Sequence, residues 1–404
     1  MDLKSGYPFW AIRSGLIHAF PRLERDLRCD VAIVGGGITG AIVATELADQ
    51  GWDVMLIEKR DIGWGSTAAS TALLQYEIDT HLVDLARQYG ENDAVLAYRA
   101  CLDALDRLRA IAQGLRGVEF RRSDSLYGAS SWRDVGKLRE EFAMRKRHHF
   151  PAHWLERKAL RALYGLDAQA AILSTAAAHV DPYRLTYRLL TRLQSHGVGV
   201  FDRSEIASIE AGARSVLLRL SNGVALRAAH AVIAGGYESQ AWLPERVARN
   251  RSSYAFVTDP LGEERIAALR HTMFWESARP YLYVRATKDH RLVVGGEDDA
   301  IDVPAKRDRR VLGKAERMAR KLQRHFPALE VRPTFCWAGT FAETKDGLPF
   351  FGPHPRHSPR LHFAMAYGGN GITYSAIGAQ LISERLHRRR SRLGELFSFD
   401  RLRR

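Results

Sequence analysis

The chain has 404 residues, of which 46% are hydrophobic and 26% are charged, a composition typical of a globular protein large enough for two domains. No apolar run approaches the roughly 20 residues that span a bilayer. Residues 1–28 mix charged and aromatic side chains, unlike the apolar core of a secretory signal. The three widely spaced cysteines show no metal-binding or redox pairing, so we expect a reducing, cytoplasmic location.

The first predicted element is a buried strand that runs into a glycine turn at residues 31–40. Gly35, Gly37 and Gly40 have the G-x-G-x-x-G spacing that opens a dinucleotide-binding helix. Gly35 allows the tight turn, Gly37 lets the backbone approach a pyrophosphate, and Gly40 lets the helix lie close to the sheet. The first N–H groups of this helix would point at the phosphates.

A second strand, residues 53–58, ends in an acidic side chain. Glu58 lies eighteen residues after Gly40, where a carboxylate can accept hydrogen bonds from a ribose diol. Because the same charge would repel a 2′-phosphate, we expect an adenine dinucleotide without that phosphate. We include the adjacent Lys59 among the expected contacts. The alternative is a glycine turn in an α/β protein that binds no nucleotide.

The loop at residues 59–72 is rich in small and hydroxylated residues. Small side chains let a long cofactor lie against the backbone, and Ser66, Thr67 and Thr71 can donate hydrogen bonds to phosphate or ribityl oxygens. An ordinary surface loop is the alternative. An amphipathic helical pattern then follows over residues 79–115.

A further strand–helix unit begins at residue 179, and an apolar strand at residues 229–234 leads into Gly235 and Gly236. These two glycines suit a second close approach of the backbone to the dinucleotide, although the pattern alone is that of a strand and turn. Residues 252–300 are β-rich. A sheet inserted here, between dinucleotide-binding segments, is a plausible cover for a reactive ring.

A second glycine loop opens a helix near the end of the chain. Its residues are Gly368, Gly369, Asn370, Gly371 and Ile372. Two such loops at opposite ends of the sequence indicate one extended cofactor that is gripped at both ends.

The formal net charge is +14, and part of it lies in residues 384–404, where eight arginines face three acidic residues. A nucleic-acid arm or a membrane-surface contact is conceivable. We favour a packed basic helix end, because Phe397 and Phe399 are spaced as in a packed tail, and we expect no nucleic-acid partner. The basic stretch 145–149 is interpreted as a solvated helix face rather than a metal site.

Together these motifs resemble the superfamily of D-amino-acid oxidase and glycine oxidase. The resemblance rests on the first glycine motif with Glu58, the Ser66/Thr67 loop, residues 179–236, residues 344–349 and residues 368–372. It covers nearly the whole chain in family order. It implies FAD as cofactor and an α/β fold, with a glutathione-reductase-like Rossmann domain and an inserted antiparallel β-sheet over the isoalloxazine. It also implies oxidation of a C–N bond of an amine or amino acid to an imine, by hydride transfer to flavin N5.

The resemblance predicts a discontinuous FAD-binding domain at residues 28–115, 175–245 and 334–390. Residues 116–174 and 246–333 form the predicted substrate or cap domain, and residues 391–404 a basic C-terminal tail. Some relatives bind flavin through a cysteine. The matching position here is Thr340, not Cys336, so we expect non-covalent FAD.

Two positions depart from the family pattern. Relatives carry carboxylate-binding arginines where this chain has Phe341 and Gly369. Because a substrate carboxylate favours a bidentate guanidinium, their loss puts a simple α-amino acid substrate in doubt or moves the task to another side chain.

Arg285 is our candidate for a replacement carboxylate anchor, with a solvent-facing strand-end arginine as the alternative. Tyr283 matches a tyrosine that lines the substrate pocket in related oxidases, or it is a buried sheet aromatic. Candidates for the base that deprotonates the amine are Gln75, Glu343, Lys345 and His362.

The expected partners are an amine or amino-acid substrate and dioxygen or a quinone-type electron acceptor. Two alternatives stay open. The first is an FAD-dependent dehydrogenase of a hydroxyl substrate such as a polyol phosphate, which the basic surface would suit. The second is a flavoprotein subunit of a larger oxidoreductase complex.

Overall fold

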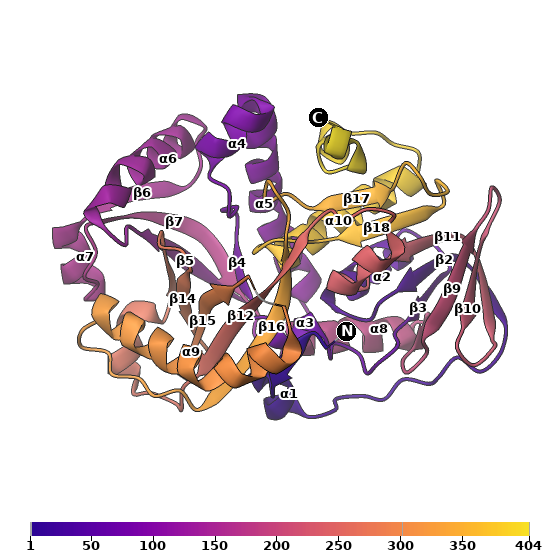
Figure 1. Cartoon of the computed structure of the whole chain (residues 1–404), viewed down its shortest axis with the longest axis horizontal. Coiled ribbons are helices and arrows are strands. Elements are labelled where there is room, and N and C mark those ends of the chain that lie inside the picture. The colour runs from indigo at the N-terminus through magenta and orange to yellow at the C-terminus, as the bar shows by residue number, and fades with distance from the viewer. Residues whose placement is uncertain (1, 301, 404) are drawn as a thin grey trace.

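The computed structural model describes residues 2–300 and 302–403, which form two β-sheets with helices around them (Figure 1). The smaller sheet has the strand order β17-β18-β11-β2-β3-β8, and β10 joins β9 to β11 at its side. Its strands are β2 (Leu27–Val34), β3 (Val54–Ile57), β8 (Gly199–Phe201), β9 (Ile206–Ala211), β10 (Val216–Leu220), β11 (Ala225–Ile233), β17 (Phe350–Pro353) and β18 (Leu361–Met365).

The centre of the smaller sheet is parallel. Strand β2 pairs in parallel with β11 and β3, and β11 pairs in parallel with β18. Val31, Ala32 and Ile33 of β2 are fully buried in succession, as expected for a parallel sheet whose two faces are both covered. This continuous apolar run is what the sequence presents before the first glycine turn.

Three helices frame this sheet: α2 (Ile38–Asp49), α8 (Pro182–Ser195) and α10 (Gly371–Leu386). Helix α2 packs against both α8 and α10. The hydroxyls of Thr39 on α2 and Ser375 on α10 are 2.8 Å apart, so the N-terminal parts of the two helices lie together. The two glycine-rich helix openings therefore lie together, although they are far apart in the sequence.

The larger sheet has the order β1-β16-β12-β15-β14-β13-β5-β7-β4, with β6 on β7, and it is antiparallel except for the pair β13–β5. Helix α9 (Pro304–His325) packs on β1, β12, β15 and β16. The strands are β1 (Lys4–Gly6), β4 (Leu73–Gln75), β5 (Arg121–Gly128), β6 (Ala152–Glu156), β7 (Ala170–His179), β12 (Arg249–Val257), β13 (Thr272–Glu276), β14 (Leu282–Ala286), β15 (Leu292–Asp299) and β16 (Phe335–Glu343).

The two sheets confirm the predicted fold class, a Rossmann-type α/β sheet with a second, largely antiparallel sheet. The predicted FAD-binding segments hold nearly all of the smaller sheet but also β4 and β16, which pair with the larger sheet. Strand β7 crosses the predicted boundary at residue 174. The larger sheet thus draws on both sets of segments, and the division at those boundaries stays a prediction.

The predicted helical pattern at residues 79–115 forms two helices, α4 (Leu82–Tyr89) and α5 (Glu91–Ala112), which are separated at Gly90. Gly90 has φ +85°, which ends α4. The remaining helices are α1 (Phe9–Ser14), α3 (Ser66–Ala69), α6 (Val135–Arg147), α7 (Arg157–Tyr164) and α11 (Arg392–Leu396). No helix among the described residues is long and apolar enough to cross a membrane.

The interpretation of residues 145–149 as a solvated helix face is wrong for Arg145. This side chain, at the end of α6, is fully buried. Its Nε donates to Glu141 Oε1 at 2.8 Å, and its Nη1 lies 3.4 Å from Glu77 Oε1. A guanidinium can be buried here because two buried carboxylates surround it.

The basic C-terminal segment packs against the fold, as the sequence indicated. Phe397 and Phe399 are buried. Arg392 forms an ion pair with Asp93 at 2.6 Å, and Arg401 one with Asp346 at 2.7 Å. The positive charge of this segment is therefore partly neutralised by acidic residues of the body of the protein.

Candidate FAD and substrate site

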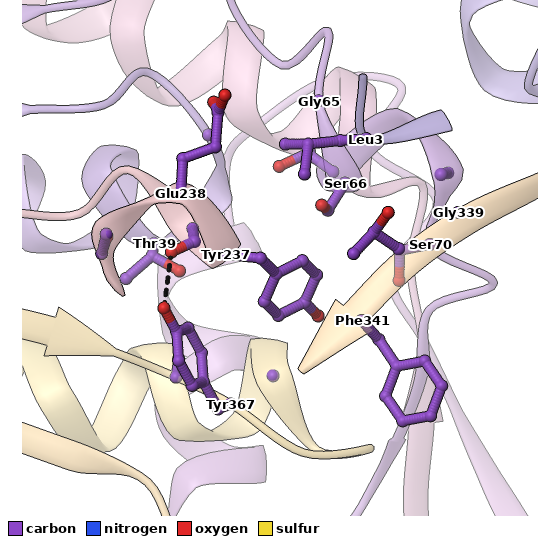
Figure 2. Close-up of a pocket in the computed structure, with 18 of the residues that line it drawn as sticks. Leu3, Thr39, Gly65, Ser66, Ser70, Tyr237, Glu238, Gly339, Phe341 and Tyr367 are labelled. Carbon is purple, nitrogen blue, oxygen red and sulfur yellow. Dashed lines mark hydrogen bonds between the residues drawn. The ribbon is translucent and has the colours of Figure 1, made fainter. Parts of the chain in front are cut away.

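One cavity of about 1070 Å³ is lined by residues of both sheets. Figure 2 shows part of its wall, where Ser66, Ser70 and Tyr237 face the interior and Phe341 comes from β16. Small-molecule sites are typically about 300–1,000 Å³, so this cavity has room for a dinucleotide. The expected cofactor contacts that line it are Gly35, Gly37, Glu58, Lys59, Ser66, Thr67, Thr71, Gly235, Gly236, Gly368, Gly369, Asn370, Gly371 and Ile372.

The first glycine motif has the geometry that its spacing predicts. Gly35 has φ +123°, and a Cβ there would lie 2.4 Å from the carbonyl oxygen of Ala234. A Cβ on Gly40 would lie 1.9 Å from the carbonyl oxygen of Gly35. Gly40 does not line the cavity but lets α2 approach the turn, which is the role expected for the third glycine.

Glu58 stands at the end of β3 inside the cavity. Its carboxylate accepts hydrogen bonds from the backbone N–H groups of Gly36 at 2.7 Å and Arg60 at 2.8 Å. Burial raises its pKa, and these two hydrogen bonds oppose the rise. The neighbouring Lys59 is paired with Glu238 at 2.9 Å, so it lines the cavity as part of an ion pair.

The hydroxyl-rich loop is held from two sides. The indole N–H groups of Trp10 and Trp337 donate to the backbone oxygens of Ser70 at 2.7 Å and Ala69 at 2.9 Å. The Thr67 hydroxyl accepts the N–H of Ile38, the first residue of α2. Ser66 Oγ lines the cavity and is buried without a hydrogen-bond partner among the described residues. An orphaned hydroxyl beside a glycine cradle fits a cofactor that carries phosphate and hydroxyl groups.

The C-terminal glycine loop is fixed by the segment that follows β4. The N–H of Gly369 donates to Asp79 Oδ2 at 2.9 Å, and Asn370 Nδ2 donates to the backbone oxygen of Glu77 at 2.7 Å. Gly368 and Gly371 lie beside these anchors in the cavity wall. The start of α10 therefore points its N–H groups at the same cavity as the start of α2.

The larger sheet supplies a polar wall to the other part of the cavity. Tyr283 of β14 and Asp298 of β15 line it together with Ser253 of β12. Burial raises the pKa of Tyr283 to about 12, while the nearby Ser253 and Thr71 act to lower it. Burial also raises the pKa of Asp298, to about 6, against a hydrogen bond with Ser253.

Arg285 does not line the cavity, although we predicted it as the carboxylate anchor. It is 2% exposed, and its Nε and Nη2 donate to the backbone oxygens of Thr71 at 2.7 Å and Val180 at 3.1 Å. Its guanidinium thus donates hydrogen bonds to backbone oxygens behind the hydroxyl-rich loop. This placement argues against contact with a substrate.

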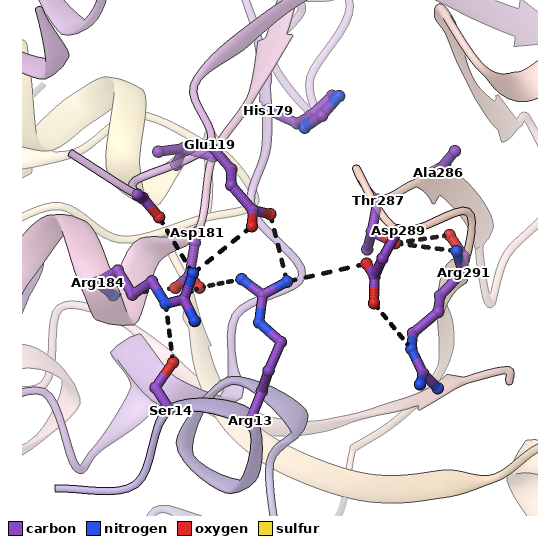
Figure 3. Close-up of polar contacts among 12 residues, drawn as sticks. Arg13, Ser14, Glu119, His179, Asp181, Arg184, Ala286, Thr287, Asp289 and Arg291 are labelled. Atoms are coloured by element: carbon purple, nitrogen blue, oxygen red, sulfur yellow. Dashed lines mark hydrogen bonds and ion pairs between the residues drawn. The ribbon is translucent and has the colours of Figure 1, made fainter. Parts of the chain in front are cut away.

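The region beyond Arg285 is occupied by internal ion pairs. Figure 3 shows Arg13 of α1 between Asp181 and Glu119, with Asp289 on its other side. Asp181 also caps α8, because its side chain accepts the N–H of Arg184. These contacts hold α1, and with it Trp10, against the loop that faces the cavity.

A family model described as FAD dependent oxidoreductase matches residues 30–385. The chain belongs to this family. It is therefore an oxidoreductase, and its cofactor is FAD.

The chain is similar to the gamma-glutamylputrescine oxidoreductase of Escherichia coli (strain K12), with 25% identity over 94% of this chain and 88% of that protein. It is 26% identical to the glycine oxidase of Bacillus licheniformis, over 88% of this chain and 92% of that protein. The crystal structure of glycine oxidase from Geobacillus kaustophilus superimposes with a TM-score of 0.77 at 20% identity, over 90% and 96% of the two chains. That similarity supports the fold.

The candidate bases of this FAD-dependent oxidoreductase do not all reach the cavity. Gln75 and Glu343 line it, whereas Lys345 and His362 do not. Glu343 is paired with Arg251 at 2.5 Å. His362 is 2% exposed, and burial lowers its pKa to about 3, so it is neutral at pH 7. None of the three cysteines lines the cavity either.

Among the lining side chains that the sequence analysis missed are Asp79, Tyr237, Arg279 and Asp298. Tyr237 directly follows the predicted glycine pair, and its ring points into the space in Figure 2. Asp298 lies near the end of β15, within residues 252–300, which the sequence predicts only to be β-rich. Arg279 lies in an irregular connection between β13 and β14, and its sequence context gives no comparable signal.

Proposed function

We propose that this FAD-dependent oxidoreductase oxidises a C–N bond of an amine or amino acid to an imine, with FAD held non-covalently. The observation that carries this proposal is one cavity with two glycine-rich helix openings on one side and the polar wall of Tyr283, Ser253 and Asp298 on the other. The amine and amino-acid names of both relatives support it and do not favour a hydroxyl substrate such as a polyol phosphate.

FAD, when bound, supplies the hydride acceptor. The residues expected to hold it are the glycines of the two helix openings, Glu58, and the hydroxyls of Ser66, Thr67 and Thr71. Tyr283 is protonated at neutral pH and can donate a hydrogen bond to the substrate. The larger sheet and the glycine loop exclude water and fix the orientation of the C–H bond that reacts.

We assign Asp298 as the group that takes the proton from the substrate ammonium. Its Oδ1 is buried without a hydrogen-bond partner among the described residues, whereas the carboxylate of Glu343 is neutralised by Arg251. A carboxylate with a pKa of about 6 is largely ionised at pH 7 and is better matched to proton transfer than one with an ordinary pKa. Asp298 thus replaces the bases suggested from the sequence.

Replacing Asp298 by asparagine should lower kcat/KM about 10²- to 10⁴-fold at pH 7, because the proton acceptor is lost. In the wild type, kcat/KM should rise with pH through about 6 as Asp298 ionises, and this limb should be absent in Asp298→Asn. Stopped-flow reduction of the flavin at several pH values measures both effects. If kcat/KM of Asp298→Asn still rose with pH near 6 as in the wild type, this role of Asp298 would be excluded.

A matched control is Asp106→Asn, which removes an exposed carboxylate that pairs with Arg122 at the surface. This variant should keep the wild-type profile. Because burial disfavours the charge of Asp298, Asp298→Asn should be at least as stable as the wild type at pH 7. A normal Tm then separates loss of chemistry from misfolding.

Anaerobic mixing of the purified protein with a panel of amines, D- and L-amino acids and polyol phosphates tests the function. Loss of the oxidised flavin absorbance with amines, but not with polyol phosphates, is expected. Bleaching by polyol phosphates alone would favour the hydroxyl-oxidising alternative. A flavin that no compound bleaches, in protein that co-purifies with a partner, would favour the subunit alternative.

Reoxidation by dioxygen or by a quinone-type acceptor belongs to the same proposal, and oxygen consumption during turnover in air-saturated buffer distinguishes the two. We further propose a cytoplasmic location, which the three free cysteines support.

A further inference from the structure

Arg279 stands on the partition between two cavities. A second cavity of about 220 Å³ adjoins the FAD and substrate cavity, and Asp79, Arg279 and Tyr281 line both. The second cavity is polar, with His81, Lys137 and Asp134 among its residues. Arg279 itself is exposed, whereas Tyr283 and Asp298 are half-buried. Its guanidinium is therefore at the outer end of the substrate region.

An aromatic stack fixes the guanidinium of Arg279. Its central carbon lies 3.6 Å from the centre of the Tyr281 ring. Tyr281 contacts Trp275 edge to face, and Trp275 stacks on Tyr127 with ring centres 3.7 Å apart. A planar guanidinium on an aromatic face keeps its edge available for hydrogen bonds, which suits the recognition of a carboxylate.

The donors of Arg279 are largely free. Its Nη2 donates to the backbone oxygen of Asp79 at a long 3.4 Å. The carboxylate of Asp79 is engaged by the N–H of Gly369, and no carboxylate forms an ion pair with Arg279 in residues 2–300 and 302–403. Arg251 and Arg285 differ, because the first is paired with Glu343 and the second with backbone carbonyls.

The spacing along the chain separates Arg279 from Tyr283, beside which we expect the C–N bond to react. Tyr281 directly precedes β14, and Tyr283 is the second residue of that strand. Both line the cavity. Alternate residues of a strand are about 6.6 Å apart. Since the guanidinium of Arg279 lies over the Tyr281 ring, we place it about one such step from Tyr283.

We propose that Arg279 binds a substrate carboxylate that is separated by a linker from the C–N bond to be oxidised. This inference rests on the proposed function and names its substrate class, an ω-amino acid or a longer amine with a terminal carboxylate. The cavity then offers both charges that such a substrate needs: Asp298 faces the amine and Arg279 faces the carboxylate. The second cavity provides room beyond Arg279 for a larger substituent.

The test compares 5-aminopentanoate with pentan-1-amine, which has the same chain and amine but no carboxylate. The wild type should have a KM for 5-aminopentanoate at least about tenfold lower. Arg279→Ala should raise this KM about 10- to 100-fold and leave the KM for pentan-1-amine and both kcat values within about threefold. Arg279→Lys should retain part of the effect, because it keeps the charge but not the bidentate geometry.

Glycine tests the linker, since its carboxylate is attached to the carbon that would be oxidised. Its kcat/KM should be lower than that of 5-aminopentanoate and should change less than about threefold in Arg279→Ala. Arg324→Ala, which removes an exposed charge on α9 that lines neither cavity, is the control and should match the wild type. Equal effects of Arg279→Ala on 5-aminopentanoate and pentan-1-amine, or a preference for glycine, would overturn the inference.

Calorimetric titration of the oxidised holoenzyme with pentanoate gives a readout that needs no turnover. Pentanoate should bind the wild type and the Arg324→Ala control, and binding should weaken at least tenfold in Arg279→Ala. If this holds while no amine reduces the flavin, the proposed function fails and the carboxylate site stands. If amines reduce the flavin but pentanoate binding is the same in Arg279→Ala, the carboxylate site fails alone.

Discussion

Replacing Gly40 by alanine should abolish FAD binding. The added methyl group would lie 1.9 Å from the carbonyl oxygen of Gly35, which belongs to the turn between β2 and α2. Neither the new Cβ nor the carbonyl oxygen of Gly35 can rotate out of the way as a side chain could. Helix α2 would therefore have to move away from the sheet. We expect a loss of at least about 3 kcal/mol in stability, at the upper end of overpacking effects.

The movement of α2 would also displace Thr39 from Ser375 and so separate the two helix openings. The purified variant should carry less than about a tenth of the wild-type flavin, measured from the absorbance spectrum after denaturation. Added FAD should raise the Tm of the wild-type apoprotein but not that of Gly40→Ala, because ligand stabilisation requires binding to the folded state.

Gly136→Ala is the matched control. Gly136 is exposed in α6, and no atom lies within 4 Å of a Cβ built there. This variant should bind FAD normally and gain up to about 1 kcal/mol, because alanine is the better helix former. A Gly40→Ala protein with a full complement of flavin would show that the close approach of α2 is dispensable.

Replacing Arg145 by leucine should destabilise the protein by about 3–5 kcal/mol, because the buried carboxylates of Glu77 and Glu141 lose their counter-charge. Glu141 also accepts the N–H groups of Leu82 and Val83 at the start of α4, and Glu77 accepts Asn370 through its backbone oxygen. The damage should therefore reach both α4 and the C-terminal glycine loop. Urea unfolding of the holoenzyme measures the loss.

The destabilisation should shrink on acidification. Burial acts to raise the pKa of Glu141, but attraction to Arg145 and His81 and the hydrogen bonds from Leu82 and Val83 together outweigh it, so the pKa lies below its ordinary value. A depressed carboxylate pKa stabilises the wild type at neutral pH, and this stabilisation is lost as the pH falls through that pKa. Without Arg145 burial raises the pKa values of both carboxylates, so part of the destabilisation of the variant is removed as they take up protons on acidification.

Arg139→Leu on the same helix provides the comparison. Arg139 is 61% exposed and pairs with the equally exposed Glu156, so its loss should change stability by no more than about 0.5 kcal/mol at any pH. A constant deficit of Arg145→Leu from pH 7 to pH 5 would mean that lost packing, rather than unpaired charge, causes the effect.

The sequence predicts those parts of the site that depend on short-range backbone geometry. The turn of Gly35 to Gly40, Glu58 at the end of the next strand and the loop of Ser66 and Thr67 all follow from local spacing, and these residues line or shape one cavity. The meeting of the two helix openings is predicted as well, because a single dinucleotide can join them.

Side chains from the larger sheet are harder to predict, since their roles depend on long-range pairing. Arg285 and Tyr283 are alternate residues of one strand, but only the structure reveals that Arg285 is covered by the backbone at Thr71 and Val180. Arg145 looked solvent-exposed within a basic run, and its partner Glu77 is 68 residues away. Glu141, four residues before Arg145, was a local signal for this ion pair.

The meeting of α2 and α10 has a consequence for synthesis of the protein. Strand β11 pairs with β2, which is made early, and with β18, which ends at Met365. Until the ribosome has passed Met365, one edge of the central sheet lacks its neighbour and the FAD cradle lacks its second half. FAD therefore cannot assist the folding of the N-terminal half alone and stabilises the chain only after α10 has been made.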